Sequence, residues 1–419
     1  MGQTMIEKIL SRNLGKSVYA GDEELFEPDL TVAYDYPGYI DSYEKQLTEE
    51  LKIDQVANPE KFMFFIDHFN PAGDSKYREV HVKTRNFAKR CNIKLYEDVG
   101  IGHQVIMEKG YVKPGMLLIH FDGHVSSLGA LGAGAISVRN AVIEALATRK
   151  VSIVVPGTMR INLVGKLERG VTARDLFHTL VQRLGASGGC NLCLEYGGEG
   201  LRSLNMDDRI TLCNQNMFLS AITSVCEQDE ETDRFLANAG LTPGMYSHVE
   251  PDQDAVYAKE YTLDLATVEP VLVAPPSSAN TVAISDYEGM KIDIGYVGSC
   301  ASGRITDFAQ VLDILEGKHI DPSTHLYAVP SSVQLQKQIA ENGMMSKLID
   351  AGACVYYPSC DFCYGMLGTM TPGQVALSTG TLNIPGRMGC TKADIYTASP
   401  YTIAASLLNG KVTDPRKVL

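Results

Sequence analysis

The chain has 419 residues, 45% of them hydrophobic and 21% charged, which is the composition of an ordinary globular protein with about two to four domains. Its 37 basic and 50 acidic residues leave a formal net charge of -13, which disfavours nucleic acid and anionic membrane surfaces as partners. No apolar run approaches the ~20 residues of a membrane span, and the N-terminal segment carries acidic residues where a signal peptide would be apolar. We therefore expect a soluble, cytoplasmic protein that binds neither nucleic acid nor membranes.

Short apolar segments of strand length recur along the chain, and residues suited to chemistry follow each one. The four clearest are residues 62–66 before Asp67-His68, 116–121 before Asp122-Gly123-His124, 292–297 before Gly298-Ser299-Cys300, and 355–357 before Pro358-Ser359-Cys360. Apolar residues at three- and four-residue spacing predict helices over residues 77–91, 136–148, 305–315 and 333–351. Such alternation is typical of α/β proteins with largely parallel sheets, in which ligands bind beyond the carboxyl ends of the strands. The pattern predicts an α/β fold with one site assembled from several loops.

Composition shifts indicate where the chain divides. Residues 270–280 are rich in proline and serine, which is typical of a linker. A second boundary is placed near residue 135, and the glycines at 185–189 are interpreted as a loop within the second segment. We expect three α/β domains over residues 1–135, 136–275 and 276–419.

Ten cysteines in a chain without an export signal indicate buried thiols and a metal site rather than disulfide bonds. Cys360-x-x-Cys363 has a spacing that lets two thiolates reach one metal centre, and Cys300 follows another strand of the same predicted domain. Three thiolates suit a four-iron four-sulfur cluster that keeps one iron open as a Lewis acid for substrate. Two alternatives stay open: a structural zinc site completed by Cys190 and Cys193, or buried thiols without a ligand.

Histidines next to carboxylates are the candidate acid–base groups. His68 follows Asp67 and His124 lies two residues after Asp122, so each carboxylate could orient an imidazole and hold its proton in place. His103 joins them because flanking glycines would allow close backbone approach. The isolated histidines are expected to be structural: His178, His248, His319 and His325.

Two arginines are presented by glycine turns. Arg304 follows Gly303 at the start of a predicted helix, and Arg387 follows Gly386 in a loop. A guanidinium in that setting suits bidentate binding of a carboxylate, although a surface salt bridge is the alternative. The glycine-rich residues 129–134 lack both the lysine of a phosphate-binding loop and the dinucleotide spacing, so they are interpreted as tight packing.

Taken in order, these segments resemble the aconitase superfamily, and most closely the large subunits of the 3-isopropylmalate dehydratases. The resemblance runs along most of the chain. The motifs that carry it are Asp67-His68, Gly102-His103-Gln104 with Glu108, Pro114-Gly115, Asp122-x-His124, Glu195-Tyr196-x-Gly198, Arg209-x-Thr211-x-Cys213-Asn214, Gly298-Ser299-Cys300-x-x-Gly303-Arg304, Cys360-x-x-Cys363-x-Gly365-Met366, Gly386-Arg387, Ser399-Pro400, Ala404-Ala405 and Asp414-Pro415-Arg416.

The resemblance implies the roles of the candidate residues. Cys300, Cys360 and Cys363 would hold a 4Fe-4S cluster. Catalytic groups would be Asp67, His68, His103, Asp122 and His124, and substrate contacts would be Ser302, Arg304 and Arg387. A separate small subunit would supply the swivelling domain, which has no room in this chain. The predicted function is that of the large catalytic subunit of a heteromeric hydro-lyase of the EC 4.2.1 type, a dehydratase, hydratase or isomerase acting on a substituted malate-like hydroxy acid.

Five positions depart from the pattern of that family. Gly123 stands where the family has serine, and Ala301 and Ser302 stand where threonine and asparagine are usual. Phe218 replaces a carboxylate and Leu382 replaces an arginine, which predicts a substrate that is less polar or has fewer carboxylates. The same two losses motivate an alternative, a non-catalytic iron–sulfur sensor or binding protein of the same fold, and a zinc-stabilised structural protein is a third hypothesis.

Overall fold

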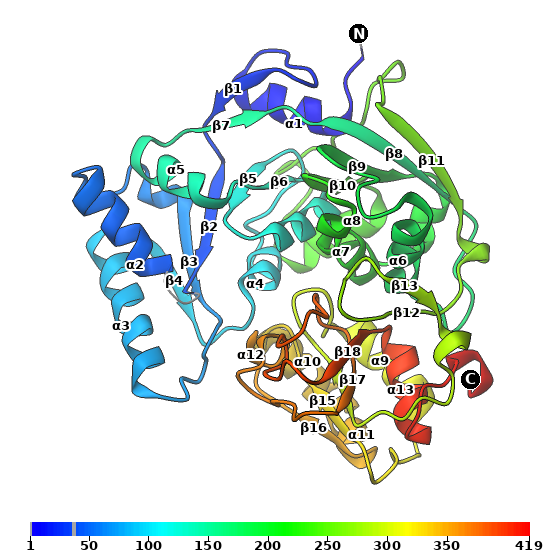
Figure 1. The fold of residues 1–419 in the computed structure, drawn as a ribbon. Helices are drawn as coiled ribbons and strands as arrows, with labels where there is room; N and C mark the ends of the chain where they lie inside the picture. Colours follow the sequence, from blue (N-terminus) through cyan, green and yellow to red (C-terminus); the bar gives the residue numbers. More distant parts are fainter. Residues whose placement is uncertain (1, 36–38) are drawn as a thin grey trace.

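The computed structural model describes residues 2–35 and 39–419 (Figure 1). Three largely parallel sheets and one short antiparallel ribbon are formed by these residues. The chain completes the sheets one after another, so the first lies in the blue and cyan part of Figure 1, the second in the green part, and the third in the yellow to red part. This is the predicted α/β architecture.

The first sheet is parallel throughout, with the strand order β4-β3-β2-β5-β6. All five residues of its strand β3 are buried, as expected for a parallel strand covered on both faces. Phe64 belongs to the apolar cluster that contains Phe87 of α3, whereas Phe65 belongs to the cluster on the opposite face. The elements of this part are β2 (Leu30–Tyr34), α2 (Tyr39–Glu44), β3 (Phe62–Ile66), α3 (Ser75–Arg90), β4 (Lys94–Glu97), α4 (Gly102–Glu108), β5 (Leu117–His120), β6 (Gly134–Ser137) and α5 (Val142–Thr148).

The N-terminal segment closes one edge of this part. Helix α1 (Met5–Leu14) begins at a capping box in which Thr4 and Glu7 satisfy each other's backbone N–H groups. Its apolar residues pack with those of β1 (Glu23–Phe26) and β7 (Val151–Val154), which pair as an antiparallel ribbon. The same cluster includes residues of β5 and β6 and of two strands of the second sheet, so the N-terminal segment packs against both the first and the second sheet.

The second sheet is also parallel and has the order β10-β9-β8-β11. A 3-10 segment, η3 (Gly123–Leu131), lies buried against it. A Cβ on Gly129 would stand 1.8 Å from the backbone oxygen of Ser224, so the glycine-rich stretch serves close packing, as predicted. The elements are β8 (Gly157–Val164), α6 (Ala173–Leu184), β9 (Leu192–Gly197), α7 (Met206–Asn214), β10 (Thr223–Cys226), α8 (Glu230–Asn238) and β11 (Lys259–Asp264).

The third sheet has the order β13-β12-β18-β17-β14-β15-β16, with a parallel run from β18 to β16 and antiparallel pairing at β12 and β13. Its elements are β12 (Val271–Val273), β13 (Thr281–Ala283), β14 (Ile294–Val297), α9 (Ile305–Leu315), β15 (His325–Ala328), α10 (Val333–Glu341), α11 (Met344–Asp350), β16 (Ala353–Val355), α12 (Asp361–Tyr364), β17 (Val375–Ser378), β18 (Asp394–Thr397) and α13 (Pro400–Asn409). Short helices in the connections are η1 (Lys45–Glu50), η2 (Pro59–Lys61), η4 (Arg139–Ala141), η5 (Glu199–Ser203), η6 (Asn216–Leu219), η7 (Leu265–Thr267), η8 (Ile284–Tyr287) and η9 (Pro415–Lys417).

Four sequence predictions of local structure were wrong in detail. Ile136 lies in β6, paired with Ile119, so the predicted helix over residues 136–148 begins only at Val142. The predicted helix over 333–351 is two helices, because Gly343 has φ +80° between them. The strand expected at 355–357 ends at Val355, where its pairing with β15 ends, and the expected linker over 270–280 contains strand β12.

The first sheet ends at Ser137, the second begins at Gly157, and the third begins at Val271. We propose that the domain boundaries lie in the two connections between these sheets. Across residues 2–35 and 39–419, no helix has the length and apolar character needed to cross a membrane.

Candidate active site

The predicted site residues of the first and third sheets meet where these two parts of the chain touch. Asp67 follows β3, Asp122 follows β5 and Cys300 follows β14, each within three residues of its strand. The backbone N–H of Cys360 donates to the backbone oxygen of Asp67 at 3.0 Å. Figure 1 shows the same junction, with α12 of the third part facing α4 of the first.

His68 is fixed by two carboxylates. Its Nδ1 lies 2.7 Å from Asp67 Oδ1 and 3.6 Å from Asp35 Oδ1. The other Asp67 oxygen accepts from the backbone N–H of Gly102 at 2.8 Å, which holds the carboxylate in place. Burial disfavours a charged imidazole, but the Cys360 thiolate and the two carboxylates outweigh burial and raise the pKa of His68 well above its usual value.

Asp35 was missed in the sequence, although it follows strand β2 as Asp67 follows β3. It is fully buried and accepts from the backbone N–H groups of Asp67 and His68 at 3.2 and 3.3 Å. His81 Nε2 lies 3.2 Å from its second oxygen. Burial opposes ionisation, but His68 and His81 outweigh it and lower the pKa of Asp35. The ionised carboxylate therefore holds the Asp67-His68 turn in place through the two backbone N–H groups.

Asp122 is the centre of a second group. Oδ1 accepts from the backbone N–H of His124 at 2.6 Å and lies 3.6 Å from His103 Nε2. The hydroxyl of Tyr34, another residue that the sequence did not indicate, donates to Oδ2 at 2.9 Å. Burial raises the pKa of Asp122, but the two histidines outweigh this and hold it well below the usual value. The ring of Tyr34 lies 5.0 Å from that of His68, so it stands between the two groups.

His124 has a defined tautomer. Its Nδ1 lies 3.0 Å from the backbone oxygen of Asn214, which can only accept, so Nδ1 carries a proton and Nε2 is left for chemistry. Burial lowers the pKa of His124. The side chain of the same Asn214 donates to Cys300 Sγ at 3.4 Å, so one residue of α7 holds both a histidine and a cysteine of the candidate site.

The three predicted cluster ligands differ in burial and in their hydrogen-bond partners. Cys300 and Cys363 are buried and Cys360 is half-buried. Arg387 donates from Nη2 to Cys363 Sγ at 3.5 Å, and although burial opposes it, this cation lowers the pKa of the Cys363 thiol. Burial, together with the charges of the other two thiolates, raises the pKa of Cys300 well above its usual value. The three sulfurs therefore have different electrostatic surroundings.

In the described part of the chain, the three thiols are not grouped as the ligands of a single metal ion would be. Among the described residues, the group whose ligand atoms all lie within 4.8 Å of one another is Asp67, His68 and Cys360, and the three cysteines do not form such a group. Thiolates around one zinc ion lie closer together than that, at about 4 Å. Donors aimed at the sulfurs, here from Asn214 and Arg387, are a common means of tuning iron–sulfur clusters.

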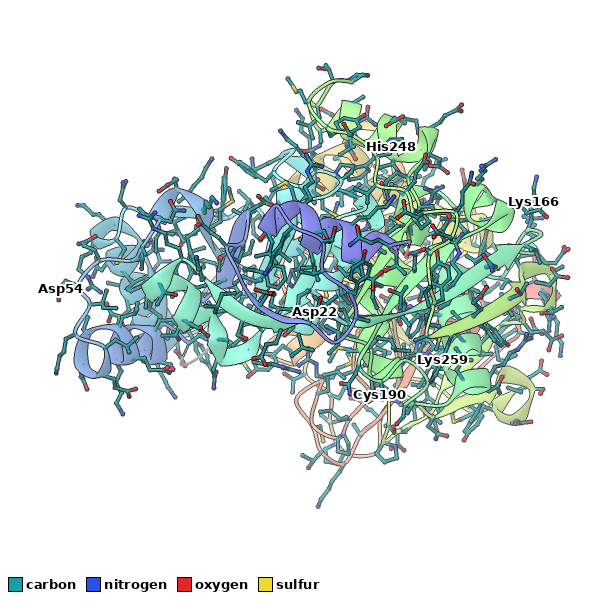
Figure 2. The ribbon with its side chains drawn as sticks, turned by 90° about the horizontal axis from the view of Figure 1, so that it is seen from above. Asp22, Asp54, Lys166, Cys190, His248 and Lys259 are labelled. Atoms are coloured by element: carbon teal, nitrogen blue, oxygen red, sulfur yellow. The ribbon has the colours of Figure 1, made fainter. Side chains whose placement is uncertain are left out.

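Cys190 and Cys193 give no support to the zinc alternative. Cys190 is exposed on the loop before β9, where Figure 2 labels it, and Cys193 is buried within β9. In the described part of the chain, no group with metal-ligand spacing includes either residue.

Asp361, inside the C-x-x-C segment, joins the first and third parts of the chain. Its two carboxylate oxygens accept from the backbone N–H groups of Phe69 at 2.6 Å and Asn70 at 3.0 Å. These residues directly follow His68. The residue between the two cysteines therefore positions the turn that carries a histidine 293 positions earlier in the sequence.

The predicted substrate-binding residues lie in the same region. Arg304 is buried and donates to Gln104 Oε1 at 2.9 Å and to the backbone oxygen of Cys300 at 2.6 Å, while its Nη1 has no hydrogen-bond partner among the described residues. Arg387 is half-buried, with its guanidinium 5.4 Å from the Tyr364 ring. Ser302 is buried, so a ligand must displace its present neighbours to reach the hydroxyl.

Two of the departures, Gly123 and Phe218, lie beside His124. A Cβ on Gly123 would meet the side chain of Met217 at 3.5 Å, so methionine fills the space beside this glycine. The ring of Phe218 lies 6.4 Å from that of His124 and stacks on His178 at 6.3 Å. Leu382 is half-buried against the apolar cluster that contains Phe218. The surroundings of His124 are thus apolar on this side.

The isolated histidines lie away from the three thiols. His248, labelled at the periphery in Figure 2, contacts Asp233 at 2.7 Å, and His319 contacts its neighbour's backbone oxygen. His178 is buried, and burial next to Arg174 lowers its pKa to about 3, so it is neutral.

Comparison with known proteins gives one consistent result. Residues 50–289 and 285–410 match the Aconitase family (aconitate hydratase). The chain is 36% identical to 3-isopropylmalate dehydratase large subunit 1 of Methanopyrus kandleri and 35% identical to 3-isopropylmalate dehydratase large subunit 1 of Thermotoga maritima, with the whole of both chains covered in each case. The crystal structure of aconitase X from Thermococcus kodakaraensis has the same fold, with a TM-score of 0.51 at 12% identity over 91% of this chain and 93% of that one. The predicted family and the predicted hydro-lyase class are confirmed, and we conclude that this chain belongs to the aconitase family.

Proposed function

We propose that this chain is the large catalytic subunit of an iron–sulfur hydro-lyase that removes or adds water at a substituted malate-like hydroxy acid. The observation that carries the proposal is the meeting of three cysteines, two histidine–carboxylate pairs and two arginines at one junction between sheets. The names of the relatives, all dehydratase large subunits, point to the same chemistry.

Cys300, Cys360 and Cys363 would hold a 4Fe-4S cluster, which supplies Lewis acidity towards a hydroxyl or carboxylate when bound. His68, oriented by Asp67 and with a raised pKa, would deliver the proton that the departing hydroxide needs. His124, oriented through Asn214, would present an unprotonated Nε2 that can accept a hydrogen bond or a proton. His103 and Asp122 would complete this proton-handling group.

Arginine side chains and the buried Ser302 would bind the substrate. Nη1 of Arg304 has no hydrogen-bond partner among the described residues, so it could donate to a substrate carboxylate. Arg387, beside Cys363, would bind a second carboxylate. The base that removes the carbon-bound proton would come from the partner subunit.

We infer an alkyl substituent on the substrate from the side of the site next to His124. Met217 fills the space at Gly123, and Phe218 packs on His124 where the family has a carboxylate. Burial of an alkyl group against this apolar surface is favourable, whereas an additional substrate carboxylate there would have no charged partner. The expected substrate class is therefore alkyl-substituted malates in preference to tricarboxylates.

A small partner subunit is the further part of the proposal. The loops on either side of α12 and the loop before Arg387 expose apolar side chains of 37% to 44% relative accessibility: Tyr356, Tyr357, Met366, Leu367 and Ile384. Exposed apolar side chains around a functional site are typical of a protein interface. The word "large" in the names of the relatives agrees with such a partner.

The test is co-expression with the candidate small subunit, anaerobic purification, and an ultraviolet assay of the conjugated unsaturated acid formed from alkyl malates, malate and citrate. We expect turnover of alkyl malates in the complex, and we expect Leu382→Arg with Phe218→Glu to shift relative kcat/KM towards citrate. Turnover of citrate without loss against alkyl malates would refute the substrate class. A complex that binds iron and sulfide but turns over none of these acids would favour the non-catalytic alternative.

A further inference from the structure

Arg174 is a buried cation that neither the sequence motifs nor the proposed chemistry uses. It lies in the first turn of α6, in the second part of the chain, and only 3% of it is exposed. Its side chain extends from α6 to two loops that belong to the third part of the chain. Nη2 donates to the backbone oxygen of Thr379 at 2.6 Å and approaches that of Ala301 at 3.5 Å.

Every acceptor of this guanidinium in the described residues is electrically neutral. Besides the two backbone oxygens, Nη1 approaches Gln215 Oε1 at 3.3 Å and the backbone oxygen of Gly380 at 3.5 Å. Asp307 and Asp175 act on it electrostatically but do not hydrogen-bond to it, since Asp175 accepts from Thr172 and Val271, and Asp307 accepts from the backbone N–H of Arg304. Burial lowers the pKa of Arg174 to about 10, so it is charged at neutral pH. A buried charge without a direct ion pair is disfavoured, so additional negative charge nearby would stabilise it.

The two loops that Arg174 holds are those of two candidate ligands. Ala301 directly follows Cys300. Thr379 and Gly380 lead to Thr381, whose hydroxyl lies 3.8 Å from Cys363 Sγ. Besides Asp307 and Asp175, the groups that act electrostatically on this cation are the thiols of Cys300 and Cys363.

We propose that Arg174 is the counter-charge of the thiolate-held cluster and the positioning residue that joins α6 to the loops of Cys300 and Cys363. This inference rests on the proposed function, because it requires the cluster that we assign to these cysteines. A cation close to a negatively charged cluster stabilises the reduced form, which carries one more negative charge, and also favours retention of the metal. Removing it lowers the reduction potential and speeds loss of iron.

Two variants separate the charge from the shape of this side chain. Arg174→Gln removes the charge and keeps a hydrogen-bond donor, whereas Arg174→Lys keeps the charge with fewer donors. Arg183→Gln on the same helix is the matched control, because Arg183 is exposed and contacts only Thr267 among the described residues. Each protein is purified anaerobically in complex with the small subunit.

The readouts are iron and acid-labile sulfide per chain, the midpoint potential from a dithionite titration followed by electron paramagnetic resonance, and the rate of iron loss to a chelator. We expect Arg174→Gln to lower the potential and to lose iron about 10-fold or more faster, as loss of an outer partner of a metal site commonly does. Arg174→Lys and Arg183→Gln should have potentials close to that of the wild type.

Two results would overturn the inference. One is a potential and iron-loss rate of Arg174→Gln equal to those of Arg183→Gln. The other is an equal fall in potential for Arg174→Lys and Arg174→Gln, which would assign the effect to hydrogen-bond geometry rather than charge. Absence of iron and sulfide from the wild type would instead refute the proposed function, so the two failures are distinguishable.

Discussion

Asp361→Asn tests how the first and third sheets are joined. The buried carboxylate accepts two backbone N–H groups, from Phe69 and Asn70, and a hydrogen bond to a charged acceptor is worth about 1.5–3 kcal/mol. Asparagine keeps one acceptor and turns an N–H group towards the other donor. Burial raises the pKa of Asp361, which offsets part of the gain from the charge, so we expect a loss of about 2–3 kcal/mol.

The assay is thermal unfolding of the anaerobically purified protein, followed by circular dichroism. A loss of this size corresponds to a fall in Tm of about 5–10 °C, at about 2–4 °C per kcal/mol for a domain of 150–250 residues. Asp313→Asn is the control, because it breaks an exposed ion pair with Arg169 that is worth only about 0–1 kcal/mol. A fall in Tm for Asp361→Asn no larger than that of Asp313→Asn would refute the reasoning.

Three other changes address the acid–base groups. His124→Ala should reduce kcat by about 100-fold or more with iron and sulfide unchanged, since it removes a positioned acid–base group; near-normal turnover would instead indicate a structural role. Tyr34→Phe removes the donor to Asp122 and should raise the pKa of that carboxyl, so the acid limb of the kcat/KM profile should move to higher pH, and an unmoved limb would contradict this. Burial lowers the pKa of His81 but the interaction with Asp35 raises it overall, so its stabilising contribution is present below about pH 6.5 and is lost as pH rises through the raised value. His81→Gln should accordingly lose more stability at about pH 5 than at about pH 9 in urea unfolding, and an equal loss at both would refute the linkage.

The local elements were predictable where one pattern decided them. Residues 62–66 and 305–315 form the strand and the helix that their apolar periodicity predicts. Ile136 was assigned to the wrong element because an apolar residue next to a glycine-rich segment suits either a helix or a parallel strand, and pairing with β5 decided it. Tertiary pairing, not local preference, set that boundary.

The candidate site was predictable to the extent that its residues follow strands. Asp35 had the same signal as Asp67, a carboxylate directly after a buried strand, and could have been found from it. Arg174 and Asp361 had no such signal, because each acts on groups 100 or more positions away in the sequence. Contacts of that kind arise from the arrangement of sheets, which one sequence does not specify directly.

The measurement that tests the central claim most directly is iron and acid-labile sulfide content after anaerobic purification of the wild type and four single variants. We predict that Cys300→Ser, Cys360→Ser and Cys363→Ser each lose most of the iron and sulfide, while Cys190→Ser, exposed on its loop, retains both. Stoichiometric zinc without sulfide in the wild type, or equal loss from Cys190→Ser and Cys360→Ser, would contradict the account.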